Sequence, residues 1–373
     1  MKKILLILAA SFILALFLIY QIRIKQNTTS ITPYPFHYPQ NLYANTKITA
    51  PILIVGDSLA VRLASFKKRL SRKLSLGFER PIKIQSLATQ GENIHRTVIK
   101  IKNLTKTPPV IIYLGNKDYN FEKLYASDSI ENIKYNFQLY ENETLRTLLM
   151  IFPSISRLVY RPINKLQLTQ QIKPDETEYT DPIYQKRQEI NFKLYQAALE
   201  ELFTFTKKQN SLVIPVTTPI NLKVPPNKSC YGSFSGDATE IQTLQSLVDK
   251  KDFKSAYQVS RQLVLLYPAN AVIQYLYSQV LTKLNRHNEA QEHAQLAIAY
   301  DCHNDRPNPI YNVILKESAK NYKYNYLDFH QFLTDESINN PTFIDETYPQ
   351  DFYMQSVIDK LASKIRKRLN LYL

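Results

Sequence analysis

The sequence predicts an α/β fold, and three observations support this prediction. Short apolar runs typical of buried parallel strands recur along the chain, helical patterns separate them, and glycines follow several of the runs. Because strands alternate with helices, we expect a parallel sheet covered on both faces. The 373 residues, 44% of them hydrophobic, are enough for about two domains. Only six residues are glycine, which excludes collagen-like and glycine-rich low-complexity proteins.

The N-terminus predicts a membrane anchor or signal segment over residues 1–25. Lys2 and Lys3 precede an uncharged apolar run, Ile4–Tyr20, which is close to the minimum length for a membrane-spanning helix. No small-residue cleavage pattern follows the run, so an uncleaved anchor is favoured over a removed signal peptide. Basic residues flank both ends of the run, so the positive-inside rule does not settle the orientation. The signal-like layout favours the bulk of the chain outside the cytoplasm. Residues 26–50, rich in Asn, Thr, Tyr and Pro, predict a tether.

The elements of the α/β domain are expected over residues 51–236 and 301–373. The first strand, Ile52–Gly56, is followed by apolar residues three or four positions apart, which predict one face of a helix. Further helices are expected over 185–209 and 354–369. The remaining strands are expected at Ile82–Leu87, Val110–Leu114, Leu212–Val216 and Tyr324–Phe329.

Residues 237–300 predict an all-α insertion instead. They contain no strand pattern, and a shift of 34 residues superposes Leu247 on Leu281 and Ala256 on Ala290. This period resembles the tetratricopeptide repeat, whose stacked helix pairs form grooves. The insertion is expected either to bind a protein partner in such a groove or only to pack against the α/β domain.

The two cysteines, Cys230 and Cys302, flank the insertion. Because the entry and exit points of an insertion are usually close in space, a disulfide at its base is expected, and it would suit an oxidising compartment. Two unpaired thiols are the alternative.

The formal net charge is +15, and basic residues concentrate between positions 62 and 83. Such a surface suits an anionic envelope polymer or lipid headgroups, while nucleic acid is an unlikely partner outside the cytoplasm. A solvated helix face is the simpler interpretation. The cluster has a single acid, Glu79, against Arg62, Lys67, Lys68, Arg69, Arg72, Lys73, Arg80 and Lys83.

Polar residues follow three strands at the point where each ends. Ser58 begins a helix directly after Gly56 and Asp57, Gly91 follows the second strand, and Gly115 follows the third. Open α/β sheets bind ligands at this edge. A serine there has an exposed hydroxyl and a backbone N–H without a helical partner, which equips it as a nucleophile beside an oxyanion site. The chain has no metal-ligand spacing and no phosphate loop, so neither a metal nor a cofactor is expected.

These residues resemble the SGNH, or GDSL-type, serine hydrolases over about 51–236 and 300–370. The resemblance extends to a membrane-anchored bacterial branch with a tetratricopeptide-repeat insertion, in which Asp301-Cys302 and Arg306 match the segment after the insertion. It implies a three-layer, flavodoxin-like parallel sheet. It also implies a single-pass protein of the bacterial inner membrane with its soluble domain in the periplasm.

The same resemblance implies roles for individual residues. Ser58 matches the nucleophile, and Gly91 matches a backbone donor of the oxyanion hole. The turn Gly115–Asp118 matches the block that supplies an asparagine side chain to that hole. Phe343–Pro349 matches the last block, in which Asp345 stands at the position of the catalytic acid.

Two positions depart from the family pattern. Lys117 occupies the asparagine position, with Asn116 one residue earlier, and either side chain is a candidate oxyanion donor. Tyr348 occupies the position of the catalytic histidine. A phenol with a pKa near 10 cannot act as a general base at neutral pH, and losing a triad member costs about 10⁴-fold or more in rate. His95 is the histidine nearest to a family block, but helical spacing directs it away from the strand end.

Two functional hypotheses follow from this pattern. The first is an esterase or acyltransferase that acts on O-acylated envelope glycans or lipids, with Ser58 as nucleophile. The second is a catalytically degenerate fold that serves as an envelope binding or scaffold module through its basic face and its helical repeats.

Overall fold

A computed structural model describes residues 9, 11–19, 33–39, 42–44, 46–76, 81–231, 238–302 and 306–369. The chain forms two compact units, one of residues 1–39 with 124–169 and one of residues 40–123 with 170–373. The sequence prediction kept 124–169 within the α/β domain, whereas these residues belong to the smaller unit.

The predicted membrane segment, Ile4–Tyr20, falls only in part within the described residues, which include Ala9 and residues 11–19 of it. Residues 11–19 are helical. In the described part of the chain, no helix combines the length and apolar character that a bilayer crossing requires.

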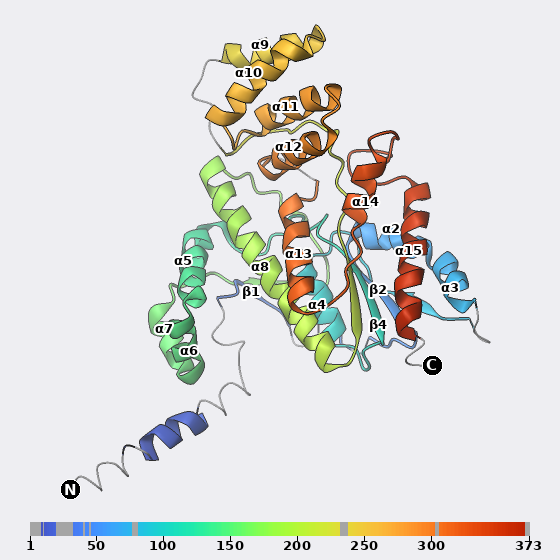
Figure 1. Ribbon diagram of the computed structural model, residues 1–373. Helices are drawn as coiled ribbons and strands as arrows, with labels where there is room; N and C mark the ends of the chain where they lie inside the picture. Colours follow the sequence, from blue (N-terminus) through green and yellow to red (C-terminus); the bar gives the residue numbers. More distant parts are fainter. Residues whose placement is uncertain are drawn as a thin grey trace. The chain divides into compact units, whose positions relative to one another are not determined.

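The larger unit is built on a four-stranded parallel sheet in the order β3-β2-β4-β6, which confirms the predicted α/β class (Figure 1). In this sheet, Gly56 pairs with Leu114 and Leu114 with Val216, so the carboxyl ends of three strands lie in register at one edge. The strands are β2 (Ile52–Gly56), β3 (Ile84–Ser86), β4 (Val110–Leu114) and β6 (Leu212–Val216).

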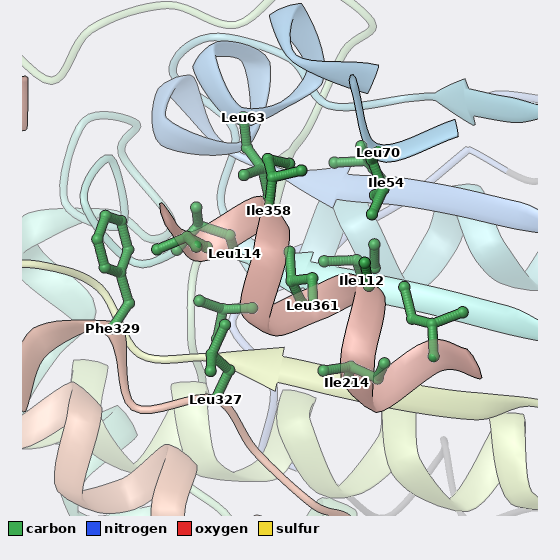
Figure 2. Packing of buried hydrophobic residues seen from close by; sticks show 14 of the residues in the cluster. Ile54, Leu63, Leu70, Ile112, Leu114, Ile214, Leu327, Phe329, Ile358 and Leu361 are labelled. Carbon is green, nitrogen blue, oxygen red and sulfur yellow. The ribbon is translucent and has the colours of Figure 1, made fainter. Parts of the chain in front are cut away.

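One face of the sheet packs against helices from both ends of the unit's sequence. Alternate strand residues such as Ile54, Ile112 and Ile214 lie in one buried cluster with helix residues such as Leu70 and Ile358, as the two-residue period of a strand requires (Figure 2). These side chains are almost fully buried, and each contributes roughly 1.5–3 kcal/mol to the stability of the fold. The helices on this face are α2 (Ser58–Ser65), α3 (Lys67–Ser75), α14 (Phe329–Glu336) and α15 (Asp351–Leu369).

The other face is covered by α4 (Ile94–Lys102), α8 (Asp181–Lys208) and α13 (Pro309–Asn321) (Figure 1). The helix predicted over 185–209 is therefore present as α8. The helix predicted after the first strand is divided at Phe66 into α2 and α3. The unit thus has three layers, with the sheet between two layers of helices.

The predicted fifth strand, Tyr324–Phe329, is wrong. Only Leu327 bridges to the sheet, where its N–H donates to Pro215 and its carbonyl accepts from Thr217. The Asp328 side chain accepts the N–H of Gln331 at 3.1 Å and caps α14, which begins at Phe329. A helix cap so close to the bridge ends the pairing after one residue.

The insertion consists of two helix pairs, in agreement with the 34-residue period. Ala256 and Ala290, which the period superposes, are both buried where the helices pack. The Asn270 side chain accepts the N–H groups of Val272 and Ile273 and caps the third helix. The four helices are α9 (Ala238–Asp249), α10 (Phe253–Leu266), α11 (Ala271–Lys283) and α12 (His287–Ala299).

The base of the insertion is held by a disulfide between Cys230 and Cys302, whose Cα atoms are 5.7 Å apart. Beside it, the buried Arg306 guanidinium lies 3.1 Å from the Asp301 carboxylate. The same carboxylate accepts the N–H groups of Asn227 and Lys228. The residues that follow the insertion therefore bind the residues that precede it.

The smaller unit contains a two-residue parallel pair, β1 (Phe36–His37) with β5 (Leu166–Gln167). The region expected as a tether thus includes a short strand. The other elements of this unit are η1 (Ser127–Ser129), α5 (Ile130–Glu141), α6 (Glu143–Ile151), η2 (Pro153–Ile155) and α7 (Ser156–Val159).

Candidate functional site

Ser58 lies at the N-terminus of α2, at the carboxyl edge of the sheet. Gly56 leads into this turn with φ +129°, and a Cβ there would stand 1.8 Å from the Leu114 carbonyl oxygen, so only glycine fits. Asp57 caps the helix by accepting the N–H of Leu59 at 3.0 Å. The Ser58 N–H therefore points out of the first helical turn and is free for another acceptor.

That acceptor is the carboxylate of Asp118. Its Oδ2 atom accepts the N–H of Ser58 at 3.1 Å and the N–H of Gly91 at 2.9 Å. These are the two backbone donors expected to form an oxyanion hole. They converge on one point, as the family resemblance implies, but a side chain of the same protein occupies that point. A helix N-terminus favours a negative charge in this position.

The Asp118 carboxylate is balanced by one cation. Its Oδ1 atom lies 3.1 Å from the Lys117 ammonium. Although burial opposes the effect, the Asp118 charge raises the pKa of Lys117 above its ordinary value. Lys117 therefore remains charged and is committed to Asp118.

A second carboxylate, Asp57, is fully buried beside Asp118. Its Oδ2 atom accepts the N–H of Asp118 at 3.1 Å. Burial, followed by repulsion from the Asp118 charge, raises the pKa of Asp57 to about 7. Of these two adjacent acids, Asp57 therefore holds its proton up to about neutral pH.

This protonation predicts how stability depends on pH. In the unfolded chain Asp57 loses its proton near pH 4, so between about pH 4 and 7 the folded protein binds the extra proton and stability falls as pH rises. We expect Asp57→Asn to remove this pH-dependent contribution to the free energy of unfolding. We compare the free energies of unfolding of the wild type and the variant, measured by urea denaturation. The wild type's advantage should be largest at pH 4 and smallest above pH 7. For the exposed control Glu176→Gln, the difference should not vary over this range, and a pH-independent difference for Asp57→Asn would contradict the assignment.

The Ser58 hydroxyl is buried and has no hydrogen-bond partner among the described residues. Asn116, Tyr113 and Tyr195 form a buried polar group nearby, in which the Tyr195 phenol interacts with both of the other side chains. Burial, followed by the Tyr195 phenol, raises the pKa of Tyr113 well above its ordinary value. Asn116 also has a φ of +104°, an uncommon conformation for a residue with a side chain. Such unpaired groups and strained backbones are concentrated at functional sites.

No described imidazole forms a hydrogen bond with the Ser58 hydroxyl. The Nε2 atom of His95 lies 3.1 Å from the Tyr119 hydroxyl, and burial lowers the pKa of His95 to about 3. Burial likewise lowers the pKa of His330 to about 4. Both rings are therefore neutral at physiological pH, and the His95 ring is bonded to Tyr119. His303 lies outside the described residues.

Asp345 and Tyr348 form a turn rather than a catalytic dyad. The exposed Asp345 carboxylate accepts the N–H groups of Thr347 at 2.7 Å and Tyr348 at 2.6 Å. Although burial opposes it, the Tyr348 and Thr347 N–H groups lower the pKa of Asp345. The Tyr348 ring lies between two cations, with its centroid 5.6 Å from the Arg62 guanidinium carbon and 5.5 Å from the Lys117 nitrogen. The residue at the expected histidine position therefore lies beside Lys117 at the site, but its side chain is a phenol.

Asp118 is the residue that sequence reasoning missed. The prediction considered Asn116 and Lys117 as oxyanion donors and left the acid beside them without a role. The signal was present, because Asp118 follows a strand end and adjoins Lys117, yet sequence alone does not indicate which backbone N–H groups an acid will reach. In the described part of the chain, no cluster of three or more His, Cys, Asp or Glu side chains could hold a metal ion.

No protein-family model and no curated protein sequence matches this chain. Among solved structures, the chain is similar to a protein from Bacteroides fragilis NCTC 9343 that is provisionally described as an acylhydrolase. The match has 10% sequence identity and a TM-score of 0.33, and it covers 84% of this chain and 87% of that chain. A similarity at this level carries no argument about activity.

Proposed function

We propose that this chain is a non-catalytic binding module built on a fold like that of the serine hydrolases. The observation that carries the proposal is the bonding of Asp118 to the N–H groups of both Ser58 and Gly91. An oxyanion hole works because its donors are free when negative charge develops on the substrate. Here the charge is already present, so a second anion at the same point would be repelled.

The surroundings of Ser58 support the same proposal. A serine nucleophile needs an adjacent base to take its proton, and the Ser58 hydroxyl has no hydrogen-bond partner among the described side chains. Lys117 is charged and paired with Asp118, and the phenol of Tyr348 cannot serve as a base at neutral pH. Neither the base nor the oxyanion donors are available for acyl transfer.

The proposal includes attachment to the inner membrane of a bacterium through residues 1–25, with the soluble part in the periplasm. The apolar run Ile4–Tyr20 supports the anchor. The disulfide between Cys230 and Cys302 supports an extracytoplasmic location, because such bonds persist in oxidising compartments.

Two surfaces are available for binding. One is the basic face around α3. The other is a groove of about 570 Å³ along the insertion, lined by Tyr275, Lys283 and His287 among others and closed by Ser337 and Ile338 of the α/β domain. A protein segment is the occupant that we propose for this second groove.

Labelling with a fluorophosphonate probe tests the absence of catalysis. We expect the folded full-length chain to remain unlabelled at Ser58 under conditions that fully label an active serine esterase, because the reaction needs the base and the oxyanion donors that this site lacks. Mass spectrometry of the Ser58 peptide provides the measurement, and Ser58→Ala gives the background. An adduct on Ser58 would refute the proposal and favour the esterase or acyltransferase hypothesis.

A second variant separates the effect of the missing base from the effect of Asp118 on the N–H groups. Tyr348→His places an imidazole at the position where the family has its base, while Asp118 still holds both N–H groups. We expect this variant to remain unlabelled. If it became labelled, the missing base rather than Asp118 would be what prevents the reaction.

A further inference from the structure

The helix α3 carries more positive charge than the fold uses. Five of its nine residues are Lys or Arg and none is acidic. Leu70 and Leu74 are buried in the core and fix which side of the helix faces the protein. The cations are therefore distributed around the remaining surface of the helix, where their partners differ.

The cations on the side of α15 are neutralised within the protein. Asp359 lies 2.7 Å from the Lys73 nitrogen and 3.5 Å from the Arg69 guanidinium, which also donates to Gln355. Arg62 of α2 is similarly paired with Asp351 at 2.6 Å. These residues have a structural role in joining α2 and α3 to α15.

The cations on the opposite side have no such partner. Four exposed residues line a groove of about 810 Å³ between α3 and the strand β3, and we call it the basic groove. None of its described lining residues is acidic, and none of the four forms an ion pair with a described acid; Glu79 and Arg80 lie outside the described residues. The four are Lys67, Lys68, Arg72 and Lys83.

The walls of the basic groove are fixed by hydrogen bonds. The Ser71 hydroxyl donates to the Ile82 carbonyl at 2.7 Å, and the Ser75 hydroxyl accepts the Ile82 N–H at 2.8 Å. On the other side, the side-chain carboxamide oxygen of Gln85 accepts the N–H groups of Thr49 and Ala50 at 2.8 Å each. β3 is an edge strand of the sheet, so no described strand pairs with its outer side at the groove.

We propose that the basic groove binds the phosphate headgroups of an anionic bilayer. Uncompensated cations attract anionic lipid, and this attraction is strongest where exposed apolar side chains accompany them. Leu76, at the end of α3, lines the same groove and is 67% exposed. This inference rests on the proposed binding role and names its ligand, but it does not depend on the chemistry of Ser58.

Lysine footprinting of the full-length protein in vesicles tests the proposal. The protein is incorporated into vesicles of phosphatidylcholine alone or with about 30% phosphatidylglycerol, and a water-soluble reagent acetylates exposed amines. We expect phosphatidylglycerol to slow acetylation of Lys67, Lys68 and Lys83 by about threefold or more, and about 0.5 M NaCl to abolish this protection. The exposed Lys207 and Lys208 at the end of α8 serve as internal controls and should not change.

Two variants and one competitor complete the test. Arg72→Glu should abolish the protection of the neighbouring lysines, whereas Lys207→Glu should leave it intact. Equal acetylation in both kinds of vesicle would overturn the proposal. Soluble polyphosphate, added to vesicles of phosphatidylcholine alone, would also overturn it if it protected the lysines as well as phosphatidylglycerol does, because the ligand would then be a soluble polyanion. Fluorophosphonate labelling reports on Ser58 independently of this assay. If the lysines were protected and Ser58 were also labelled, the non-catalytic role would be refuted and the proposal of a lipid-binding groove would stand.

Discussion

Replacing Asp118 by alanine is expected to lower the free energy of unfolding by about 3–5 kcal/mol. The carboxylate is the acceptor for the N–H groups of Ser58 and Gly91 and the partner of Lys117. Alanine would leave these three donors without an acceptor in a buried site. Each buried donor left unpaired costs about 1–3 kcal/mol, and an uncompensated charge adds to that loss. Urea denaturation at pH 7 measures the change.

The isosteric variant Asp118→Asn is the matched comparison. Its carboxamide oxygen can still accept from Ser58 and Gly91, so only the charge opposite Lys117 is lost, and we expect a smaller change of about 1–2 kcal/mol. Equal losses for the two variants would mean that the backbone hydrogen bonds contribute little. A loss below about 1 kcal/mol for Asp118→Ala would contradict the role of Asp118 as the internal occupant of this site.

The strands of the sheet could be predicted because their signals are local. Continuous apolar runs such as Ile52–Gly56 and Val110–Leu114 have few alternatives to a strand buried on both faces. The 34-residue period likewise specified the helix pairs, because each repeat carries the same small residues where its helices meet. The strand expected at Tyr324–Phe329 was wrong because a local signal there was overridden, since Asp328 caps a helix that begins one residue later.

The chemistry of the site was less predictable because it depends on distances between segments far apart in the chain. Sequence reasoning assigned Ser58, Gly91 and the Gly115–Asp118 turn to one edge, and the structure places the first two around the Asp118 carboxylate. One of the four turn residues must fill the point between the two N–H groups. Backbone geometry, including the positive φ of Asn116, decides which one, and composition does not reveal it. Asp345 illustrates the same limit, since its carboxylate bonds to its own turn.

A second buried charge network, away from Ser58, fixes α4 against the loop after β4. The Arg96 guanidinium is fully buried and donates to both carboxylate oxygens of Glu122. It also donates to the Tyr43 hydroxyl at 2.8 Å, while Asn93 donates to Glu122 at 3.0 Å. The pair therefore joins three segments that are far apart in the sequence.

Replacing Arg96 by methionine should lower the free energy of unfolding by about 3–5 kcal/mol, because Glu122 would keep a buried charge without a cation. The double variant Arg96→Met with Glu122→Leu should recover at least half of this loss, since two apolar side chains remove the unpaired charge together with its partner. Lys102→Met on the same helix breaks only the exposed pair with Glu201 and should change stability by less than about 1 kcal/mol. If the double variant were as unstable as the single one, packing and hydrogen bonds of Arg96, rather than the charge left on Glu122, would account for the loss.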